Sequence, residues 1–167
     1  MQKMWSPWRS EYIESFKSKD ENEECVFCGA GEKNIDDDSN LIVHKAEHCY
    51  VMLNLYPYNS GHLMVIPYRH LSDFTLLEES ELIEIMNLLQ LSEKALTDAM
   101  KPQGFNIGAN LGKVAGAGID QHLHFHLVPR WNGDTNYMPV IGEVKVISQD
   151  LMVTKSRLIE AFSKIQK

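Results

Sequence analysis

Three histidines stand at alternate positions, His122, His124 and His126, in the run HLHFHLV. Alternate side chains of an extended strand project from one face, so the three imidazoles would form a row. Neutral imidazole is a nucleophile and a metal ligand near pH 7, and the row is therefore a candidate reactive surface or metal site. A purely structural role is disfavoured, because each buried imidazole would need partners for both ring nitrogens.

Two cysteines, Cys25 and Cys28, have the two-residue spacing that lets both thiolates bind one tetrahedral ion. With Cys49 they are too few, and odd in number, for a disulfide framework, so we expect a reducing compartment such as the cytoplasm. A structural zinc site is the favoured interpretation and an inert pair the next. A redox motif would need a strand-to-helix turn, whereas acidic and polar residues flank this pair.

The chain of 167 residues, 44% of them hydrophobic, is long enough for one domain with one core. Its 16 basic and 23 acidic residues give a formal charge of -7, which argues against binding to nucleic-acid backbones or anionic membranes. No apolar run approaches the roughly 20 residues of a membrane span, and no apolar leader segment begins the chain. We expect a soluble, cytoplasmic protein without nucleic-acid or membrane partners.

The elements that must position these residues can be predicted from local patterns. The first forty residues show little periodicity and end in an acidic loop. Strand patterns follow over 41–44, 49–54 and 62–67, the first two joined by a turn over 45–48.

Residues 75 to about 100 change to helical spacing, with Thr75 and Glu78 as a capping box and Pro102 and Gly104 as the stop signal. We assign the apolar stripe of this helix to the core: Leu82, Ile85, Met86, Leu89, Leu96 and Met100.

A further strand over 105–110, a small-residue loop over 112–118 and the histidine strand follow. The last helix is expected over about 150–165, with an apolar face made of Leu151, Leu158, Ile159 and Phe162. These elements predict an α+β fold with helices on one face of a mainly antiparallel sheet. The histidines would lie on the opposite face or at the edge.

The run HLHFHLV resembles the HxHxHxx motif, with apolar x, of the histidine triad (HIT) nucleotide hydrolases and transferases. The resemblance covers about Cys25 to Arg130 and includes the upstream LNLYPYNSGHLMVIPYRH. WSPWRSEYI, and the long run from NLGKV to NYMPV, resemble the diadenosine tetraphosphate phosphorylases and their bacterial relatives. The resemblance implies a HIT-like fold with one long helix between strands and a C-terminal helix. We expect one domain over 1–167: an arm with the CxxC (1–40), a core (41–130) and a C-terminal extension and helix (131–167).

The resemblance also implies roles. His124 would attack the α-phosphorus of a nucleotide, and His126 would donate to a non-bridging or leaving oxygen. Asn54 would lie near the nucleoside and the α-phosphate, and Asn110 would contact phosphate. A turn residue before Gly112 is the alternative interpretation of Asn110.

The loop before the triad is rich in glycine, including Gly116, so its backbone N–H groups can approach a phosphate while Lys113 adds a charge. The hydrolase branch of the family usually has Ala-Gly-Gln-Ser/Thr here, whereas this chain has AGAGIDQ. Gln121 could replace the missing polar contact, although strand alternation points it away from the histidines unless a bulge intervenes.

Many bacterial relatives pair an early CxxC with two later histidines, and those positions here are His70 and His122. Together with Cys25 and Cys28 they would form a closed, structural zinc site. Zinc would then fix the strand that carries His124. A solvent-exposed strand end is the alternative for His70, His62 is expected to be structural, and no organic cofactor is expected.

The segment after the triad would shape the substrate side or form a surface turn; its polar and aromatic members are Trp131, Asn132, Gly133, Asp134 and Asn136. Trp131 could equally contact a second subunit. Arg130 could bind phosphate or pair with a carboxylate.

The leading functional hypothesis is an enzyme that cleaves dinucleoside polyphosphates at the α-phosphate through a covalent nucleotidyl-His124 intermediate, with phosphate or water as acceptor. Alternatives are a nucleoside phosphoramidase or adenylate-conjugate hydrolase, and a non-enzymatic zinc- or nucleotide-binding module. Members of the family usually pair, so the resemblance implies a homodimer.

Overall fold

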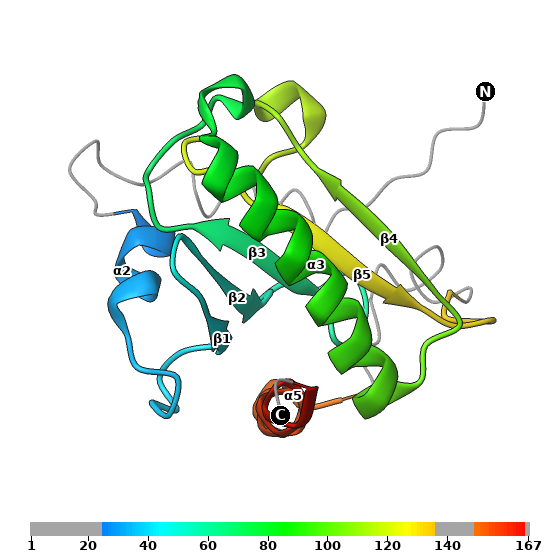
Figure 1. Cartoon of the computed structure of the whole chain (residues 1–167). Coiled ribbons are helices and arrows are strands. Elements are labelled where there is room, and N and C mark those ends of the chain that lie inside the picture. The colour runs from blue at the N-terminus through cyan, green and yellow to red at the C-terminus, as the bar shows by residue number, and fades with distance from the viewer. Residues whose placement is uncertain (1–24, 136–148, 166–167) are drawn as a thin grey trace, which may run out of the picture.

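The computed structural model describes residues 25–135 and 149–165 (Figure 1). The WSPWRSEYI run and Asn136 lie outside this range. The helices are α2 (Val26–Glu32), α3 (Glu79–Met100) and α5 (Leu151–Ile165), with short 3-10 helices at Phe74–Leu76 and Lys113–Ala115. The strands are β1 (Ile42–Lys45), β2 (Cys49–Leu53), β3 (Leu63–Pro67), β4 (Gly104–Ala109) and β5 (Phe125–Arg130).

The strands form one antiparallel sheet in the order β1-β2-β3-β5-β4. Strand β5 therefore lies between β3 and β4, and its His126 faces Met64 on one side and Gly108 on the other. One long helix separates β3 from β4 and another follows β5 (Figure 1). This arrangement confirms the predicted α+β fold with a mainly antiparallel sheet.

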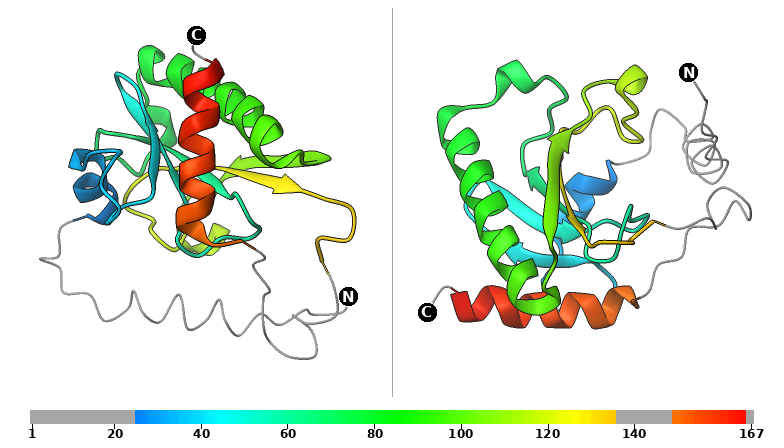
Figure 2. Two further views of the ribbon diagram at one scale, coloured as in Figure 1. Left: turned by 90° about the horizontal axis from the view of Figure 1, so that it is seen from below. Right: turned by 90° about the vertical axis from the view of Figure 1, so that its right-hand side faces the viewer.

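Helices α3 and α5 pack on one face of the sheet, whereas α2 lies on the other (Figure 2). The larger core lies under α3 and α5 and includes Leu63, Leu127 and Phe162. A smaller cluster around Phe27 of α2 and Tyr50 of β2 covers part of the opposite face. The sheet thus has one face that α3 and α5 cover over most of its strands and one face that is more open, where the histidines lie.

Helix α3 begins later than predicted, and its capping box is a different one. Thr75 belongs to a 3-10 helix that Asp73 caps. The capping box of α3 pairs Glu78 with Glu81, whose carboxylate accepts the backbone N–H of Glu78 at 2.8 Å. The Thr75/Glu78 and Glu78/Glu81 pairs both have the spacing of a capping box, and the structure uses the second pair. Glu81 also accepts a hydrogen bond from Arg69.

The predicted apolar stripe of α3 is only partly in the core. Ile85, Leu89 and Leu96 are buried, but Leu82 and Met86 are 39% and 58% exposed. The helix contacts both the sheet and α5, which rotates its buried side toward Leu88 and Ala95. Helix α2 was not predicted, because seven residues are too short to show a helical period.

Cys49 lies in the larger core and is therefore separate from the other two cysteines. Burial there raises the pKa of its thiol to about 12. Among the described helices, none is both long and apolar enough to cross a membrane.

Candidate functional site

The three histidines share one side of the sheet, but only His126 lies within a strand. Both neighbours of β5 end their pairing at Phe125, so His122 and His124 lie in the segment that precedes the strand. The prediction of one continuous strand is therefore wrong for these two residues. The alternation itself is confirmed in the side-chain contacts, because the rings of His124 and His126 lie 4.8 Å apart and Leu123 is buried in the larger core.

The hydrogen bond that His124 makes selects one tautomer of its ring. Its Nδ1 lies 2.8 Å from the backbone oxygen of His122, so Nδ1 carries the proton and donates it to that carbonyl. The lone pair is then on Nε2. Burial lowers the pKa of His124, which keeps the ring neutral near pH 7. A neutral imidazole with a fixed lone pair can act as a nucleophile.

His126 is held in a defined tautomer by a fourth histidine, His62, which is fully buried. The Nδ1 atom of His62 accepts the backbone N–H of Tyr58 at 3.1 Å, so the ring proton of neutral His62 is on Nε2. That Nε2 lies 3.0 Å from Nδ1 of His126 and donates to it. The proton of neutral His126 is therefore on Nε2, from which it can be donated to a phosphate oxygen.

The turn that carries His62 needs a glycine beside it. Gly61 has a φ of +77°, a left-handed conformation that glycine adopts without strain. A Cβ at this position would lie 2.6 Å from Sδ of Met100 and 3.0 Å from Leu96. The turn can therefore pack against the end of α3 only without a side chain there. The sequence prediction of a structural His62 captured this turn but missed its contact with His126.

Asn54 lies at the end of β2 beside this histidine pair. Its side-chain nitrogen is 3.3 Å from Nδ1 of His62, and its side-chain oxygen accepts the backbone N–H of Tyr56 at 3.0 Å. Asn54, His62, His126 and His124 thus form one connected group of side chains.

The remaining predicted substrate residues lie around the loop between β4 and the triad. Asn110 follows β4 directly and donates its amide N–H to the backbone oxygen of Gly116 at 3.3 Å. Gly116 has a φ of 91°, so the loop uses a conformation that favours glycine there. Gln121 is exposed, and Lys113 is 80% exposed with its Nζ 3.8 Å from Asp120.

A second cluster lies beside the triad and contains all four predicted metal ligands. One donor atom from each of Cys25, Cys28, His70 and His122 lies within 4.8 Å of the others. The Sγ of Cys25 is 3.3 Å from Nδ1 of His122, and the Sγ of Cys28 is 3.4 Å from Nδ1 of His70. Helix α2 brings the two thiols together because both cysteines stand at its start.

These spacings fit a shared tetrahedral ion. Thiolate and imidazole ligands of one tetrahedral zinc lie about 3.6 Å apart, which follows from metal–ligand lengths of about 2.3 and 2.1 Å. His122 also donates from Nε2 to the backbone oxygen of Pro67 at 2.9 Å, which leaves Nδ1 available as a ligand. The group could therefore hold a metal ion.

Phe27 and His122 join the two clusters. The ring of Phe27, which lies between the two cysteines, is 5.6 Å from the ring of His122 and 5.0 Å from that of His124. The His122 side chain belongs to the metal group, whereas its backbone oxygen accepts from His124. An ion in the group would therefore be coupled to the ring of His124.

Arg130 is bound by a carboxylate. Its guanidinium group pairs with Asp134 at 2.6 and 2.8 Å, so of the two predicted roles the structure shows the pairing with a carboxylate. Trp131, Asn132 and Gly133 form the turn between the two partners.

Comparisons with known proteins agree with this geometry. The sequence profile of the HIT domain matches residues 36–133. A Mycobacterium tuberculosis protein named AP-4-A phosphorylase is 39% identical over 161 residues, which cover 95% of this chain and 83% of that protein. An adenosine 5'-monophosphoramidase of Schizosaccharomyces pombe is 30% identical, over 76% of this chain and 95% of that protein.

Solved structures share the fold. The crystal structure of a Zn-bound histidine triad family protein from Mycobacterium smegmatis superposes with a TM-score of 0.68 at 25% identity, covering 86% of this chain and 96% of that chain. With the domain match, the identity to curated relatives and the grouped histidines, the chain belongs to the HIT domain family of nucleotide hydrolases and transferases and is an enzyme of that family.

Proposed function

We propose that this enzyme cleaves dinucleoside polyphosphates such as diadenosine tetraphosphate at the α-phosphate, and that orthophosphate accepts the nucleotidyl group. The observation that carries the proposal is the hydrogen bond from Nδ1 of His124 to the His122 carbonyl, which leaves a nucleophilic lone pair on Nε2. The relative named AP-4-A phosphorylase, at 39% identity over most of the chain, supports this substrate class.

The reaction divides into two displacements. In the first, Nε2 of His124 bonds to the α-phosphorus while the bond to the bridging oxygen breaks, and ATP leaves from diadenosine tetraphosphate. The adduct carries a proton on Nδ1, and the His122 carbonyl accepts this hydrogen bond as the ring becomes positively charged. In the second, an oxygen of orthophosphate attacks the phosphorus, the P–N bond breaks, and ADP leaves.

His126 stabilises the charge that develops on phosphate oxygens in both steps. Its Nε2 carries the proton that would be donated, because the hydrogen bond from His62 to Nδ1 places the proton on Nε2. Asn54 is proposed to lie near the nucleoside and the α-phosphate. Asn110, the backbone of Gly116 and, more distantly, Gln121 are proposed to contact the phosphate chain.

The test is incubation with diadenosine tetraphosphate, with and without orthophosphate, followed by chromatography of the nucleotides. We expect ADP and ATP in equal amounts, formed only when phosphate is present. AMP and ATP without phosphate would instead identify water as the acceptor. No cleavage would contradict the substrate class, and adenosine 5'-phosphoramidate would then be the next substrate, as the relative named for that activity suggests.

The metal is proposed to be zinc, because two thiolates and two imidazoles are a donor set typical of structural zinc sites. Four protein ligands would complete the coordination sphere of such an ion, which would then stabilise the fold and supply no Lewis acid to the substrate. Cys25 and Cys28 would hold α2 to His122 through this ion, with His70 as the fourth ligand. Location in the cytoplasm stays a prediction.

A homodimer through β4 is the proposed assembly. Among the strands that the structure describes, β4 is the last in the sheet; its run GFNIGA carries no charge, and Ile107 is 54% exposed. Proteins usually blunt such an edge with charges or proline, so an uncharged edge favours pairing with the same strand of a second copy.

Replacing Ile107 with aspartate is expected to convert the dimer to a monomer, because two carboxylates would face each other near the symmetry axis. Light scattering after size-exclusion chromatography measures the mass. Val153→Asp is the matched control, since Val153 is 52% exposed on α5, a helix that packs against β1 at the opposite end of the sheet from β4. A monomeric wild-type chain, or a dimer that survives Ile107→Asp, would contradict this assembly.

A further inference from the structure

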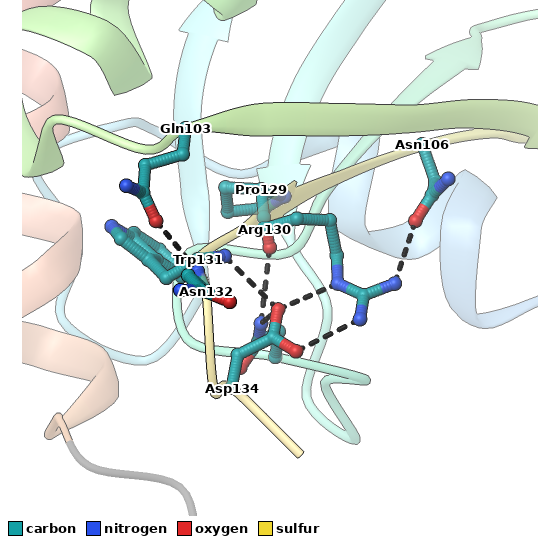
Figure 3. Close-up of polar contacts among 8 residues, drawn as sticks. Gln103, Asn106, Pro129, Arg130, Trp131, Asn132 and Asp134 are labelled. Carbon is teal, nitrogen blue, oxygen red and sulfur yellow. Dashed lines mark hydrogen bonds and ion pairs between the residues drawn. The ribbon is translucent and has the colours of Figure 1, made fainter.

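Asp134 is a buried carboxylate in the turn after β5 that the proposed chemistry does not use (Figure 3). Its side chain is only 7% exposed. It accepts hydrogen bonds from Nε and Nη2 of Arg130 at 2.6 and 2.8 Å and from the backbone N–H of Trp131 at 3.1 Å. The pairing with Arg130 lowers the pKa of Asp134 to about 2, so the carboxylate is charged at neutral pH.

The same carboxylate contacts the turn that carries His62. The amide group of Asn59 donates one N–H to Asp134 at 2.9 Å and another to the backbone oxygen of Pro129 at 3.1 Å. The backbone oxygen of Asn59 in turn accepts the N–H of His62 at 3.1 Å. Asn59 therefore links the end of β5 to the backbone of His62.

Arg130 extends the network to the next strand. Its Nη1 donates to the side-chain oxygen of Asn106 at 2.9 Å, and Asn106 lies on β4 opposite Val128 of β5 (Figure 3). One charged pair thus connects the turn before β3, the end of β5 and the middle of β4. The turn before β3 carries His62 and β5 carries His126, so the network connects the two segments whose relative position sets the distance between these rings.

We propose that Asp134 is a positioning residue for His126, acting through Asn59 and His62. The hydrogen bond of 3.0 Å between the two imidazoles determines which nitrogen of His126 carries the proton. Such a bond weakens steeply when its length or angle changes, so a small shift of the turn would release His126 into a mixture of tautomers. The catalytic consequence rests on the proposed function, whereas the tautomer of His126 does not.

The experiment compares Asp134→Asn with Glu81→Gln. Asparagine keeps the shape but offers one acceptor oxygen in place of two, so its NH₂ group would face a donor of Arg130, Asn59 or Trp131. Glu81 is a matched control, because its side chain is 6% exposed and it pairs in the same way with Arg69, far from Asp134 in the sequence. Both variants lose a buried carboxylate that pairs with an arginine, but only Asp134 is connected to His62.

Two readouts are needed. For Asp134→Asn we expect kcat for diadenosine tetraphosphate to fall about 10- to 100-fold while KM changes less than about threefold, since misplacement of an acting group costs that much. We also expect the ¹⁵N shifts of the His62 and His126 ring nitrogens to move from the values of single tautomers toward averaged values. Glu81→Gln should leave both readouts unchanged despite a comparable loss of stability.

Unchanged kcat and unchanged ring ¹⁵N shifts in Asp134→Asn would overturn the proposal. If that variant does not fold, Asn59→Ala tests the positioning role instead, because it keeps the Arg130–Asp134 pair and removes the link to the turn. The same changes in the ring ¹⁵N shifts are expected. If the wild-type enzyme does not cleave the substrate at all, the proposed function fails. The ¹⁵N shifts still test the positioning role in that case.

Discussion

Replacing His124 with alanine is expected to lower kcat for diadenosine tetraphosphate by at least about ten-thousand-fold, because removal of a covalent nucleophile eliminates the two-step route. Nucleotide binding should survive, since Asn54, Asn110 and the loop backbone are untouched by the change. Turnover by chromatography and affinity by calorimetry, measured on the same preparation, separate the two effects.

His48→Ala is a suitable control for this experiment. The described contacts of His48 with Glu84 use its backbone N–H, at 2.7 Å, so the imidazole can be removed without loss of that bond. His124→Asn would add a second test, because it keeps a polar side chain without a nucleophilic ring nitrogen. Activity retained in either His124 variant would contradict the covalent mechanism.

The second large effect is expected at the metal group. Cys28→Ser should reduce bound zinc from about one per chain to near zero and lower the melting temperature by at least about 10 °C, because the binding energy of a structural ion is also folding energy. Zinc content by elemental analysis and thermal unfolding by circular dichroism measure the two quantities. Chelation of the wild-type enzyme should lower its melting temperature in the same way.

Cys49→Ala distinguishes loss of metal from loss of core packing. Cys49 is fully buried in the larger core, outside the group of four ligands, so this variant should be less stable yet retain its zinc. Zinc retained by Cys28→Ser would contradict the proposed ligands. Chelation that abolished turnover without affecting thermal stability would instead indicate a catalytic metal.

The sequence predicted the fold class and the order of elements, because strand alternation and the long helical period are local patterns. It did not predict how α3 is rotated, since the buried side of that helix depends on its contacts with the sheet and α5, which local periodicity does not report. Helix α2 was missed because its seven residues are too few to show a helical period. Its position depends instead on a tertiary contact, the packing of Phe27 against His122 and His124.

In the candidate site, residue types and the family resemblance were enough to group His70 with His122 and the cysteines, as the structure shows. The role of His62 could not be obtained in this way. Its contact with His126 joins positions 64 residues apart, and its tautomer depends on a backbone N–H of Tyr58. Likewise, the choice of Asp134 as the partner of Arg130 follows from the turn geometry after β5.

The four ligands of the metal group come from positions 25, 28, 70 and 122, so 97 residues separate Cys25 from His122. During synthesis, the two thiols leave the ribosome long before the last imidazole. Strand β5 must also insert between β3 and β4, a late, non-local step in assembly. The cysteine pair is therefore made well before His122, and an ion in this group could gain its fourth ligand only once the segment that also carries His124 and His126 has been synthesised.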